Sequence, residues 1–434
     1  MARKAKLLEK LGEEIKDIKI ENVNELDIDI LKEITIHMRD LTDYRGDISY
    51  QPLENIVLIV FIALMANCNE WIEIYQFGVI HKDWFSRFLN LKYGIPSLST
   101  IRRTMAVIDP TELEEQCVKI ITKKIEEMVK LFQGKQELLV DEVKEKDIIS
   151  YDGKVCNSSS RKKSKTGTQK PVNAMSAFNV TKDICLATKF IDEKTNEIPT
   201  GPELIKMLDL TNTISTFDAL NTQDKTIKAI VEKGGNYVAP IKENQKSLYN
   251  DIKDYFSDKV LYEDAINESY YEEIEKSHNQ IEKRIYVMTS KIDWLPNKEK
   301  WKNIRSIGFV AREYEKDDKK VTDVRYYITD LNSTEINEFK NAVRGEWGIE
   351  NNLHWHLDYT FREDANLTMN KNAQSNLNIL RKLCLNILKL IKPVYNKSLK
   401  MIRFILGQDF ENEINRILSC LNIEELKRIT ENTQ

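Results

Sequence analysis

Residues 213–241 read TISTFDALNTQDKTIKAIVEKGGNYVAPI, and their pattern is the strongest indication of the fold class. Thr213–Phe217 is a short β-branched run that predicts a strand, and Tyr237–Ile241 predicts a second strand. Between them, the pattern over 222–233 predicts a helix that ends at Gly234-Gly235. A strand–helix–strand unit of this kind predicts a sheet with helices packed on its faces.

Predicted strands and helices also alternate on both sides of this unit. Asp147–Tyr151 predicts another strand, Ala174–Val180 and Ile184–Ile191 predict a hairpin, and a helix is expected over about 201–209. Downstream, residues 246–340 combine an acidic helical piece with three further strands, and a long helical pattern starts near Asn332. We therefore expect an α/β (mixed α+β) protein. The three downstream strands are expected at Arg284–Thr289, Ile304–Arg312 and Val324–Thr329.

The region before the first strand is expected to be helical. Ile56–Ala66 is the longest apolar run, and its 11 residues are too few to span a bilayer, so we interpret it as a buried helix. Trp84–Leu91 continues the helical pattern. Ser97 and Ser99 are candidate N-caps of a helix that carries Arg102 and Arg103. Such a helix is compatible with contact to DNA and equally with an ordinary bundle helix.

Composition sets the broad class. The chain has 434 residues, 41% hydrophobic and 31% charged, which is typical of a soluble globular protein of two or three domains. No apolar segment follows the basic N-terminus, and the six cysteines include no CxxC pair. We therefore expect a cytoplasmic protein without a disulfide framework or a cysteine-based zinc site.

The charge is distributed unevenly, although the net charge is only −4. Residues 153–182 hold seven basic residues and no acid, and residues 365–408 hold eight basic residues and no acid. The compensating acids are concentrated in 251–275. Segregated charge of this kind either forms a basic face that binds nucleic acid or belongs to ordinary solvated faces, and charge alone leaves both open.

Two aspartates follow apolar strands. Asp152 follows Ile148–Tyr151, and Asp218 follows Thr213–Phe217, so each is expected at the end of its strand. Each position suits a cation ligand, although a single aspartate there is more often a turn former or a helix N-cap.

A third group of polar residues lies in the helical pattern after residue 341. Glu346, Glu350, His354 and Asp358 follow at i+4 steps and are expected to form one polar stripe on a helix. Beside it, three apolar residues are expected to face the core. They are Ile349, Leu353 and Leu357.

Three carboxylates from separate elements suit Mg²⁺, which prefers hard oxygen ligands. Two such ions about 4 Å apart activate a water and stabilise the leaving oxygen in phosphodiester cleavage. His354 and His356 are weaker candidates for a zinc site, because no cysteine accompanies them. General base, substrate contact or packing is the preferred interpretation of these two histidines.

Several motifs, in order, resemble insertion-sequence transposases of the DDE superfamily, specifically the H-repeat-associated (ISAs-type) group. The similarity extends over about 29–408. The N-terminal blocks are Asp43-Tyr-Arg45, Gly94-Ile-Pro-Ser97 and Ile108-Asp-Pro110. The later ones are Tyr151-Asp-Gly-Lys154, Met175-Ser-Ala-Phe178, Asp192-Glu-Lys-Thr-Asn-Glu-Ile198, Thr216-Phe-Asp-Ala219, Gly234-Gly-Asn-Tyr-Val238, Lys242-Glu-Asn-Gln245, Ile281-Glu282, Arg344–Asn351, Leu353-His-Trp355, Leu357-Asp358 and Glu363-Asp364.

The resemblance implies a ribonuclease-H-like catalytic domain whose catalytic and metal-binding residues are Asp152, Asp218 and Glu350. It implies two Mg²⁺ ions, with Mn²⁺ as a substitute. The expected activity is hydrolysis at insertion-sequence ends followed by strand transfer. The expected partner is double-stranded DNA, both element ends and target, bound by a homodimer, with neither a membrane nor a small-molecule substrate.

Further residues are expected to contact DNA. Lys242 and Asn244 follow the strand 237–241 and are expected near the same sheet edge, and Arg344 lies beside the glutamate motif. The basic segments 154–170 and 381–403 are expected to neutralise phosphates. Trp347 and Trp355 are expected to pack in the core rather than to contact DNA. The remaining expected DNA-binding residues are Lys154, Arg161, Lys162, Lys163, Arg102 and Arg103.

Four positions differ from the usual residues of the family without removing a metal ligand. Cys156-Asn157 stands where the family usually has Arg-Gly, Asn173 where it has a histidine, Gln280 where it has an arginine, and Glu346 where it has a histidine. Glu346 adds negative charge one turn from Glu350. An alternative function is therefore a transposase-derived DNA-binding protein that no longer cleaves, and a third is a nuclease that cleaves without joining.

The expected domain organisation follows these patterns. A charged extension and a helical transposase-associated domain precede the catalytic core, which an insertion divides, and a helical tail follows. The expected bounds are 1–28 for the extension, 29–135 for the helical domain, 136–245 for the first part of the core, 246–340 for the β-containing insertion, 341–408 for the catalytic helix with the basic helical segment, and 409–434 for the tail.

Overall fold

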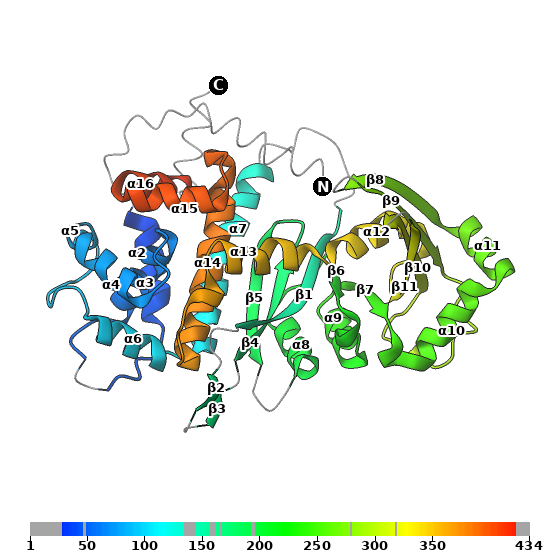
Figure 1. Cartoon of the computed structure of the whole chain (residues 1–434), viewed down its shortest axis with the longest axis horizontal. Helices are drawn as coiled ribbons and strands as arrows, with labels where there is room; N and C mark the ends of the chain where they lie inside the picture. Colours follow the sequence, from blue (N-terminus) through cyan, green and yellow to red (C-terminus); the bar gives the residue numbers. More distant parts are fainter. Residues whose placement is uncertain are drawn as a thin grey trace.

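The structure is a computed structural model, and it confirms the expected mixed α+β class (Figure 1). One nine-stranded sheet has helical segments before and after it in the chain. The described residues are 28–46, 49–133, 145–156, 161–164, 167–169, 171–191, 196–277, 280–316 and 319–421.

The centre of the sheet has the expected ribonuclease-H-like arrangement. Strand β1 pairs antiparallel with β4 on one side and parallel with β6 on the other, and the sheet order is β5-β4-β1-β6-β7-β11-β10-β9-β8. β7 is parallel to β6, whereas β11 is antiparallel to β7. The core strands are β1 (Asp147–Cys156), β4 (Val172–Asn179), β5 (Ile184–Ile191), β6 (Thr213–Phe217) and β7 (Asn236–Ile241).

The expected insertion does contain strands, and these strands extend the central sheet rather than forming a separate one. β11 joins directly to β7, and β10, β9 and β8 follow outward. The outermost strand, β8, was not expected from the sequence. The bounds are β8 (Tyr270–Ser277), β9 (Gln280–Thr289), β10 (Ser306–Lys316) and β11 (Lys319–Thr329), and a short separate hairpin pairs β2 (Arg161–Ser164) with β3 (Gly167–Gln169).

Helices cover both faces of the sheet. Odd-numbered residues of β1, such as Ile149 and Tyr151, share one core with α8, α9 and α10. Even-numbered Ile148 shares the opposite core with Phe339 of α12. Consequently, alternate residues of β1 face α8 and α12. The bounds are α8 (Glu197–Lys206), α9 (Asp224–Glu232), α10 (Lys246–Ser257), α11 (Lys259–Glu268), α12 (Ile336–Gly345) and α13 (Trp355–Tyr359).

The N-terminal helices share one core with the C-terminal helices. The apolar run Ile56–Ala66 is buried, as expected, and lies almost entirely within α3. Trp84–Leu91 is helical only at its start, because α5 ends at Phe85. The helices are α2 (Ile28–Arg39), α3 (Leu53–Met65), α4 (Trp71–Ile80), α5 (Lys82–Phe85), α6 (Leu98–Val107), α7 (Pro110–Gln133), α14 (Lys371–Tyr395), α15 (Leu399–Gln408) and α16 (Phe410–Leu421).

The expectation that segment 381–403 contacts DNA phosphates is wrong for its buried cations. Arg381 and Arg403 are fully buried, and Lys382 and Lys389 nearly so. The ammonium of Lys382 donates to the hydroxyls of Ser176 and Thr188 at 2.8 and 2.9 Å. The three cations on α14 contact polar groups inside the fold, since α14 lies between the N-terminal helices and the sheet. Arg403 is on α15 and donates to the Leu64 carbonyl of α3.

We expect Glu114 on α7 to make stability depend on pH. This buried carboxylate accepts a hydrogen bond from the Thr188 amide, and burial raises its pKa to about 7 against the opposing charge of Lys382. The raised folded-state pKa means that stabilisation is complete below about pH 4 and is lost as the pH rises through 7. The loss amounts to roughly 3 kcal/mol.

Glu114→Gln should remove this loss. We expect the unfolding free energy of Glu114→Gln, measured in urea relative to that of wild type, to be higher at pH 8 than at pH 5. The adjacent exposed residue offers a matched control, Glu115→Gln, which should leave the pH profile unchanged. A difference between Glu114→Gln and wild type that is the same at both pH values would contradict the assignment.

Candidate active site

Asp152 does not end its strand, contrary to expectation. β1 continues to Cys156, because its pairing with β4 extends to Cys156 and Val172. Its pairing with β6 stops earlier, at Tyr151 and Phe217. Asp152 therefore lies in mid-strand relative to β4 and just beyond the last paired residue relative to β6.

Asp218 follows Phe217 directly, as expected, and so lies beside Asp152 in the parallel register of β1 and β6. Its carboxylate caps the short helical turn Ala219–Asn221 by accepting from the backbone amide of Asn221 at 3.1 Å. The side-chain amide of Asn221 also donates to Asp218 Oδ1 at 2.8 Å. The N-cap interpretation is therefore confirmed for this residue, which also lies beside Asp152.

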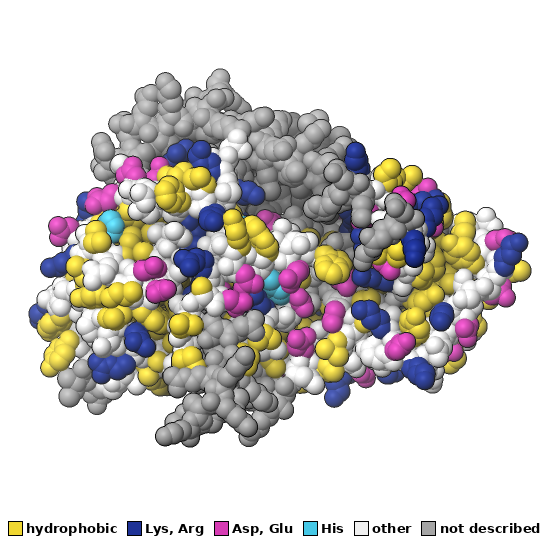
Figure 2. Space-filling model, viewed as in Figure 1, with side chains coloured by type: hydrophobic (Ala, Val, Ile, Leu, Met, Phe, Trp, Pro, Cys, Tyr) yellow, Lys and Arg dark blue, Asp and Glu magenta, His cyan; other side chains and the backbone are white. Residues whose placement is uncertain are grey.

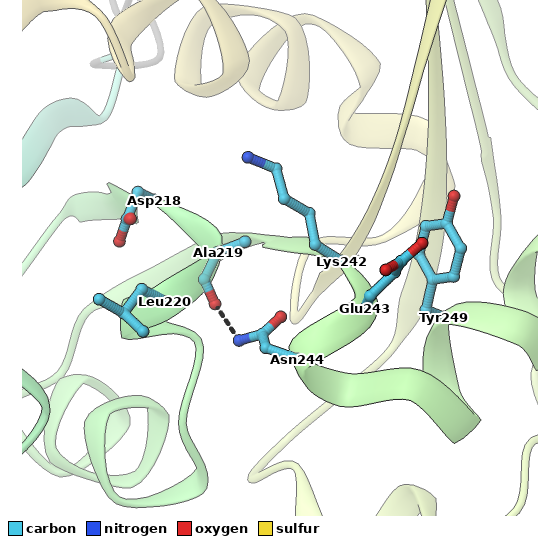
Figure 3. A pocket seen from close by; sticks show the side chains of 7 residues that line it. All are labelled: Asp218, Ala219, Leu220, Lys242, Glu243, Asn244 and Tyr249. Atoms are coloured by element: carbon cyan, nitrogen blue, oxygen red, sulfur yellow. Dashed lines mark hydrogen bonds between the residues drawn. The ribbon is translucent and has the colours of Figure 1, made fainter.

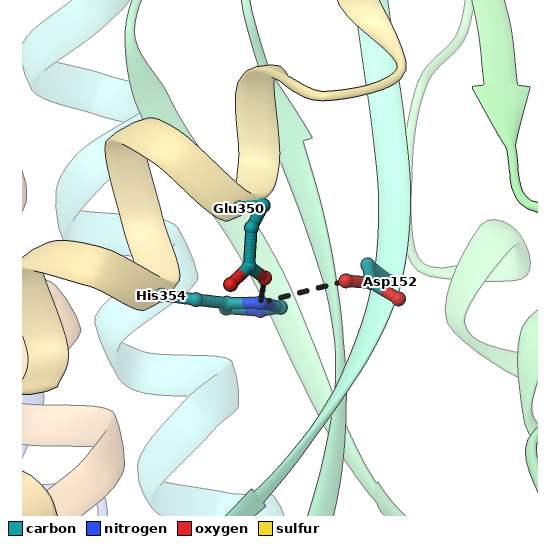
Figure 4. A group of neighbouring side chains, drawn as sticks. All are labelled: Asp152, Glu350 and His354. Carbon is teal, nitrogen blue, oxygen red and sulfur yellow. Dashed lines mark hydrogen bonds and ion pairs between the residues drawn. The ribbon is translucent and has the colours of Figure 1, made fainter. Parts of the chain in front are cut away.

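Glu350 opens a π-helical turn, Glu350–His354, between α12 and α13. Turns of this kind are rare and occur frequently at functional sites. Glu350 Oε2 lies 2.9 Å from Nδ1 of His354, which is also 3.5 Å from Asp152 Oδ2. Figure 4 shows the three side chains converging from β1 and from the helical turn. Their ligand atoms lie within 4.8 Å of one another, which is compatible with a metal ion.

The polar stripe forms only in part. Glu350 and His354 share one side, but Glu346 forms an ion pair with Arg325 at 3.3 Å, and Asp358 pairs with Lys154 at 2.6 Å. The apolar residues beside the stripe are buried as expected. They are Ile349, Leu353 and Leu357.

Negative charge is concentrated at this site. Burial, together with the charges of Glu197, Asp218 and Glu350, raises the pKa of Asp152 to about 7. Among the described residues, neither Asp152 nor Glu350 has an ion-pair partner other than His354. Hard oxygen donors with uncompensated charge fit a divalent cation such as Mg²⁺ or Mn²⁺. Figure 2 shows acidic side chains gathered near the middle of this face.

His354 is held as a neutral imidazole inside the fold. Burial lowers its pKa to about 4, although the hydrogen bond to Glu350 acts in the opposite direction. Because carboxylates only accept, Nδ1 carries the proton and donates it. Nε2 is buried and has no hydrogen-bond partner in the part of the chain that the structure describes. His354 therefore orients the Glu350 carboxylate toward Asp152.

Lys242 and Asn244 line a pocket that also contains Asp218 (Figure 3). Lys242 directly follows β7, so it lies at the same sheet edge as Asp218, as expected. The amide of Asn244 donates to the Ala219 carbonyl at 2.6 Å. Asn244 thereby fixes the turn after Asp218, while Lys242 brings a positive charge to the pocket.

The other expected DNA-binding residues are in varied environments. Arg102 and Arg103 are exposed on α6, whose N-cap is Ser97, one of the two expected caps. Lys154 is largely buried against Asp358. Arg344 pairs with Glu273 and Glu275 at 3.3 and 2.7 Å. The side chains of Arg161, Lys162 and Lys163 lie outside the described residues.

The expectation that the two tryptophans pack in the core is wrong, and the structure also places the residues that differ from the family pattern. Trp347 and Trp355 are 57% and 49% exposed, so neither packs in the core. Glu346 is neutralised by Arg325 and thus adds less charge near Glu350 than expected. Cys156 is fully buried, and Asn173 lies on β4. The side chain of Gln280 lies outside the described residues.

Glu197 and Asn221 lie next to the acids of this site, but they were not predicted as site residues. Glu197 lies in a block that the family resemblance included, but nothing in the spacing indicated its direction. Its carboxylate accepts from Asn221 at 3.4 Å. Only the packing of α8 against β4 and β5 brings it to the sheet edge.

A ribonuclease-H-like sheet with an aspartate on β1, a second after β6 and a glutamate on a later helix defines the class of DDE-type proteins. Comparison with known proteins gives the family. The chain belongs to the transposase DDE domain family, whose model matches residues 144–387. A second model, described as DDE_Tnp_1-associated, matches residues 35–120. The resemblance inferred from the sequence motifs is thus confirmed.

Individual relatives are similar over most of the chain. The H repeat-associated putative transposase YhhI of Escherichia coli K12 is 28% identical over 364 residues, covering 82% of this chain and 90% of the relative. The putative protein YbfL of the same strain has the same identity and coverage. An uncharacterized protein in the dhlA 3′ region of Xanthobacter autotrophicus is 26% identical over 277 residues, which is 64% of this chain and 86% of that protein.

A solved structure of the piggyBac transposase synaptic complex with hairpin DNA aligns with 98% of this chain and 84% of its own. Its identity is 12% and its TM-score 0.38. Within the described residues, we find no helix of sufficient length and apolarity to cross a membrane.

Proposed function

We propose that this chain is an active DNA transposase that hydrolyses phosphodiester bonds at insertion-sequence ends and joins the freed strand to target DNA. The convergence of Asp152, Asp218 and Glu350 at one sheet edge carries the proposal. Asp152 and Glu350 both lie beside His354, and Asp218 lies beside Asp152 in the register of β1 and β6. Three separate parts of the chain contribute these acids, and the family match spans all three. The relative YhhI, which is named an H repeat-associated putative transposase, supports the same class of activity.

Each acid has a distinct part in the proposed site. Asp152 is central, since both the Glu350–His354 pair and Asp218 lie beside it. Two bound Mg²⁺ ions, or Mn²⁺ ions, would supply an activated water and stabilisation of the leaving oxygen. His354 keeps Glu350 turned toward Asp152, and Lys242 offers a positive charge to a phosphate at the pocket.

DNA binding in this proposal depends on exposed cations around the site. Arg102 and Arg103 are exposed and could contact DNA phosphates, and Lys242 lines the pocket that contains Asp218. Double-stranded DNA, including both element ends and target, is the proposed substrate, and a homodimer would bring two ends together. Phosphate contacts release counterions, so the affinity should fall steeply as salt rises.

Glu350→Gln is the variant that tests this function. DNA carrying the native flanks of the gene, incubated with Mg²⁺ or Mn²⁺, should be nicked at the borders by wild type. The variant should cleave at least ~10²-fold more slowly, because it loses a charged metal ligand. Bound metal ions contribute several kcal/mol of transition-state stabilisation to such a reaction. Gel separation of labelled strands measures both cleavage and joining.

A matched substitution controls for the loss of charge. Glu232→Gln on α9 removes an exposed acid that pairs with Lys228, and it should cleave like wild type. If wild type binds the borders but cuts them with neither metal, the chain is instead a DNA-binding protein that no longer cleaves. If it cuts but never joins, the chain is a nuclease.

A further inference from the structure

Strand β1 contacts the helical segment 346–358 through three residues of one face. Successive residues of a strand point to opposite faces, so residues two apart share a face. Each contact joins a polar side chain on β1 to the segment. The contacts are Ser150 Oγ to the Glu346 carbonyl at 2.9 Å, Asp152 Oδ2 to His354 Nδ1 at 3.5 Å, and Lys154 Nζ to Asp358 Oδ2 at 2.6 Å. The candidate metal site is therefore the middle contact of a row of three.

The last two contacts have matching spacings on the strand and on the helix. Asp152 and Lys154 are two residues apart, which is a rise of about 6.6 Å along a strand. His354 and Asp358 are four residues apart, which is a rise of about 6 Å along a helix. Because the two steps are nearly equal, the contact between Lys154 and Asp358 forms in the same register that brings His354 to Asp152.

The middle contact contains a repulsion. Asp152 and Glu350 are carboxylates from different elements, and with His354 their ligand atoms lie within 4.8 Å of one another. Like charges this close repel each other. Before a cation binds, this repulsion pushes the helical segment away from the strand. Lys154 supplies an attractive ion pair at the adjoining contact, and this ion pair acts in the opposite direction.

The ammonium of Lys154 is directed to the helical segment rather than to solvent. The side chain of Lys154 is 11% exposed, whereas that of Asp358 is 42% exposed. Their hydrogen bond is short and charge-assisted, which is typical of strong pairing. A DNA phosphate would have to displace Asp358 to reach the ammonium. The geometry therefore favours a role inside the protein over the expected contact of Lys154 with DNA.

A second ion pair joins the same two parts of the chain away from the site. Lys146, directly before β1, lies 3.0 Å from Glu335, directly before α12. The side chains of this pair are 24% and 29% exposed, so both ion pairs are partly buried. A general stabilising role would apply to both of them, but of the two it is the Lys154 pair that adjoins the metal ligands. The Lys146 pair therefore offers a matched comparison.

We propose that Lys154 is a positioning residue, whose ion pair with Asp358 keeps the helical segment at the distance from β1 at which Asp152 and Glu350 bind one divalent cation. The inference rests on the proposed function, because it concerns the same metal centre. Lys154 touches neither the cation nor the DNA in this role. It acts through the two carboxylates, by fixing the elements that carry them.

Mn²⁺ binding to the full-length protein tests this role by the direction of the change. Free Mn²⁺ is followed by its electron paramagnetic resonance signal during titration. Lys154→Met should weaken Mn²⁺ binding at least ~10-fold, as expected when a residue that orients metal ligands is lost. Charge alone predicts the opposite, because removing a positive charge beside the site strengthens cation binding. Lys154→Arg keeps the ion pair and should retain most of the affinity.

Asp358→Asn breaks the same contact from its more exposed side, where folding is less at risk. It should weaken Mn²⁺ binding about as much as Lys154→Met. The double variant should bind no more weakly than either single variant, because both substitutions remove one contact. Lys146→Met is the matched control, and its Mn²⁺ affinity should equal that of wild type although it removes a similar ion pair.

An Mn²⁺ affinity of Lys154→Met equal to or higher than that of wild type overturns the proposal. An equal loss in Lys146→Met also overturns it, because the effect would then reflect general stability. Asp152→Asn separates this failure from that of the proposed function. If Asp152→Asn binds Mn²⁺ as tightly as wild type, the metal centre itself is wrong. If Asp152→Asn loses binding while Lys154→Met does not, only the role of Lys154 is refuted.

Discussion

Asp152→Asn should abolish metal-dependent cleavage while leaving the fold intact. The amide keeps the size of the side chain and removes the charge that lies between Glu350 and Asp218. Because two cations would share this carboxylate, we expect a fall in the single-turnover cleavage rate of at least ~10³-fold, equivalent to several kcal/mol of transition-state stabilisation. The measurement is cleavage of labelled border DNA at saturating Mg²⁺.

The fold should tolerate this change well. Asp152 is partly buried, with its pKa raised by burial and by neighbouring acids, so removing its charge relieves repulsion in the metal-free protein. The melting temperature of Asp152→Asn without metal should equal or exceed that of wild type. Asp293→Asn, which alters an exposed aspartate paired with Lys298, serves as the control for both assays. If Asp152→Asn still cleaves DNA in a metal-dependent reaction, the assignment of the catalytic acids is wrong.

Glu363→Gln should cause the largest loss of stability among the substitutions considered. Glu363 and Arg381 are both fully buried, with Arg381 Nη1 3.5 Å from Glu363 Oε1. Asn378 donates to the same oxygen at 2.8 Å. Glutamine retains an acceptor for Asn378 but leaves the guanidinium buried without its counter-charge. Urea unfolding should show a loss of about 3–5 kcal/mol.

Two comparisons show whether the charge pair is responsible. The apolar double variant Glu363→Leu/Arg381→Met should be more stable than Glu363→Gln alone, since it leaves no unpaired charge. The exposed pair of Arg87 and Glu411, at 3.1 Å, supplies the surface equivalent, and Glu411→Gln should cost at most ~1 kcal/mol. If Arg381→Met weakened DNA binding but left unfolding unchanged, the structural assignment of Arg381 would be wrong.

The sequence predicted the central strands well because their patterns are strong. β6 has the expected bounds, and β7 differs by one residue. β8 was missed because its sequence, YYEEIEKS, carries three glutamates, and such composition is depleted in strands. It pairs at the edge of the sheet, where charged side chains are tolerated and discourage further pairing. Tertiary position, rather than local propensity, decides that element.

The site was predictable where motif and topology agree, and less so elsewhere. The placement of Asp218 followed from the strand pattern, whereas the length of β1 depended on β4, which pairs beyond Asp152. The basic residues of α14 looked like a DNA-binding segment, because sequence charge does not show burial. Glu197 could not be placed from spacing, since its direction depends on how α8 packs. Residue types were therefore easier to predict than orientations.

The shared core of the N- and C-terminal helices has a consequence for synthesis on the ribosome. The last residue of α3 is Met65, and the first residue of α14, which covers it, is Lys371. At about 5–20 residues per second, roughly 15–60 s separate the two during translation. The apolar surface of α3 stays uncovered by its C-terminal partners throughout that interval. In a prematurely terminated chain, this apolar surface of α3 would stay exposed permanently. We therefore expect chaperones and proteases to bind such a chain, so that it does not accumulate as a partly active protein.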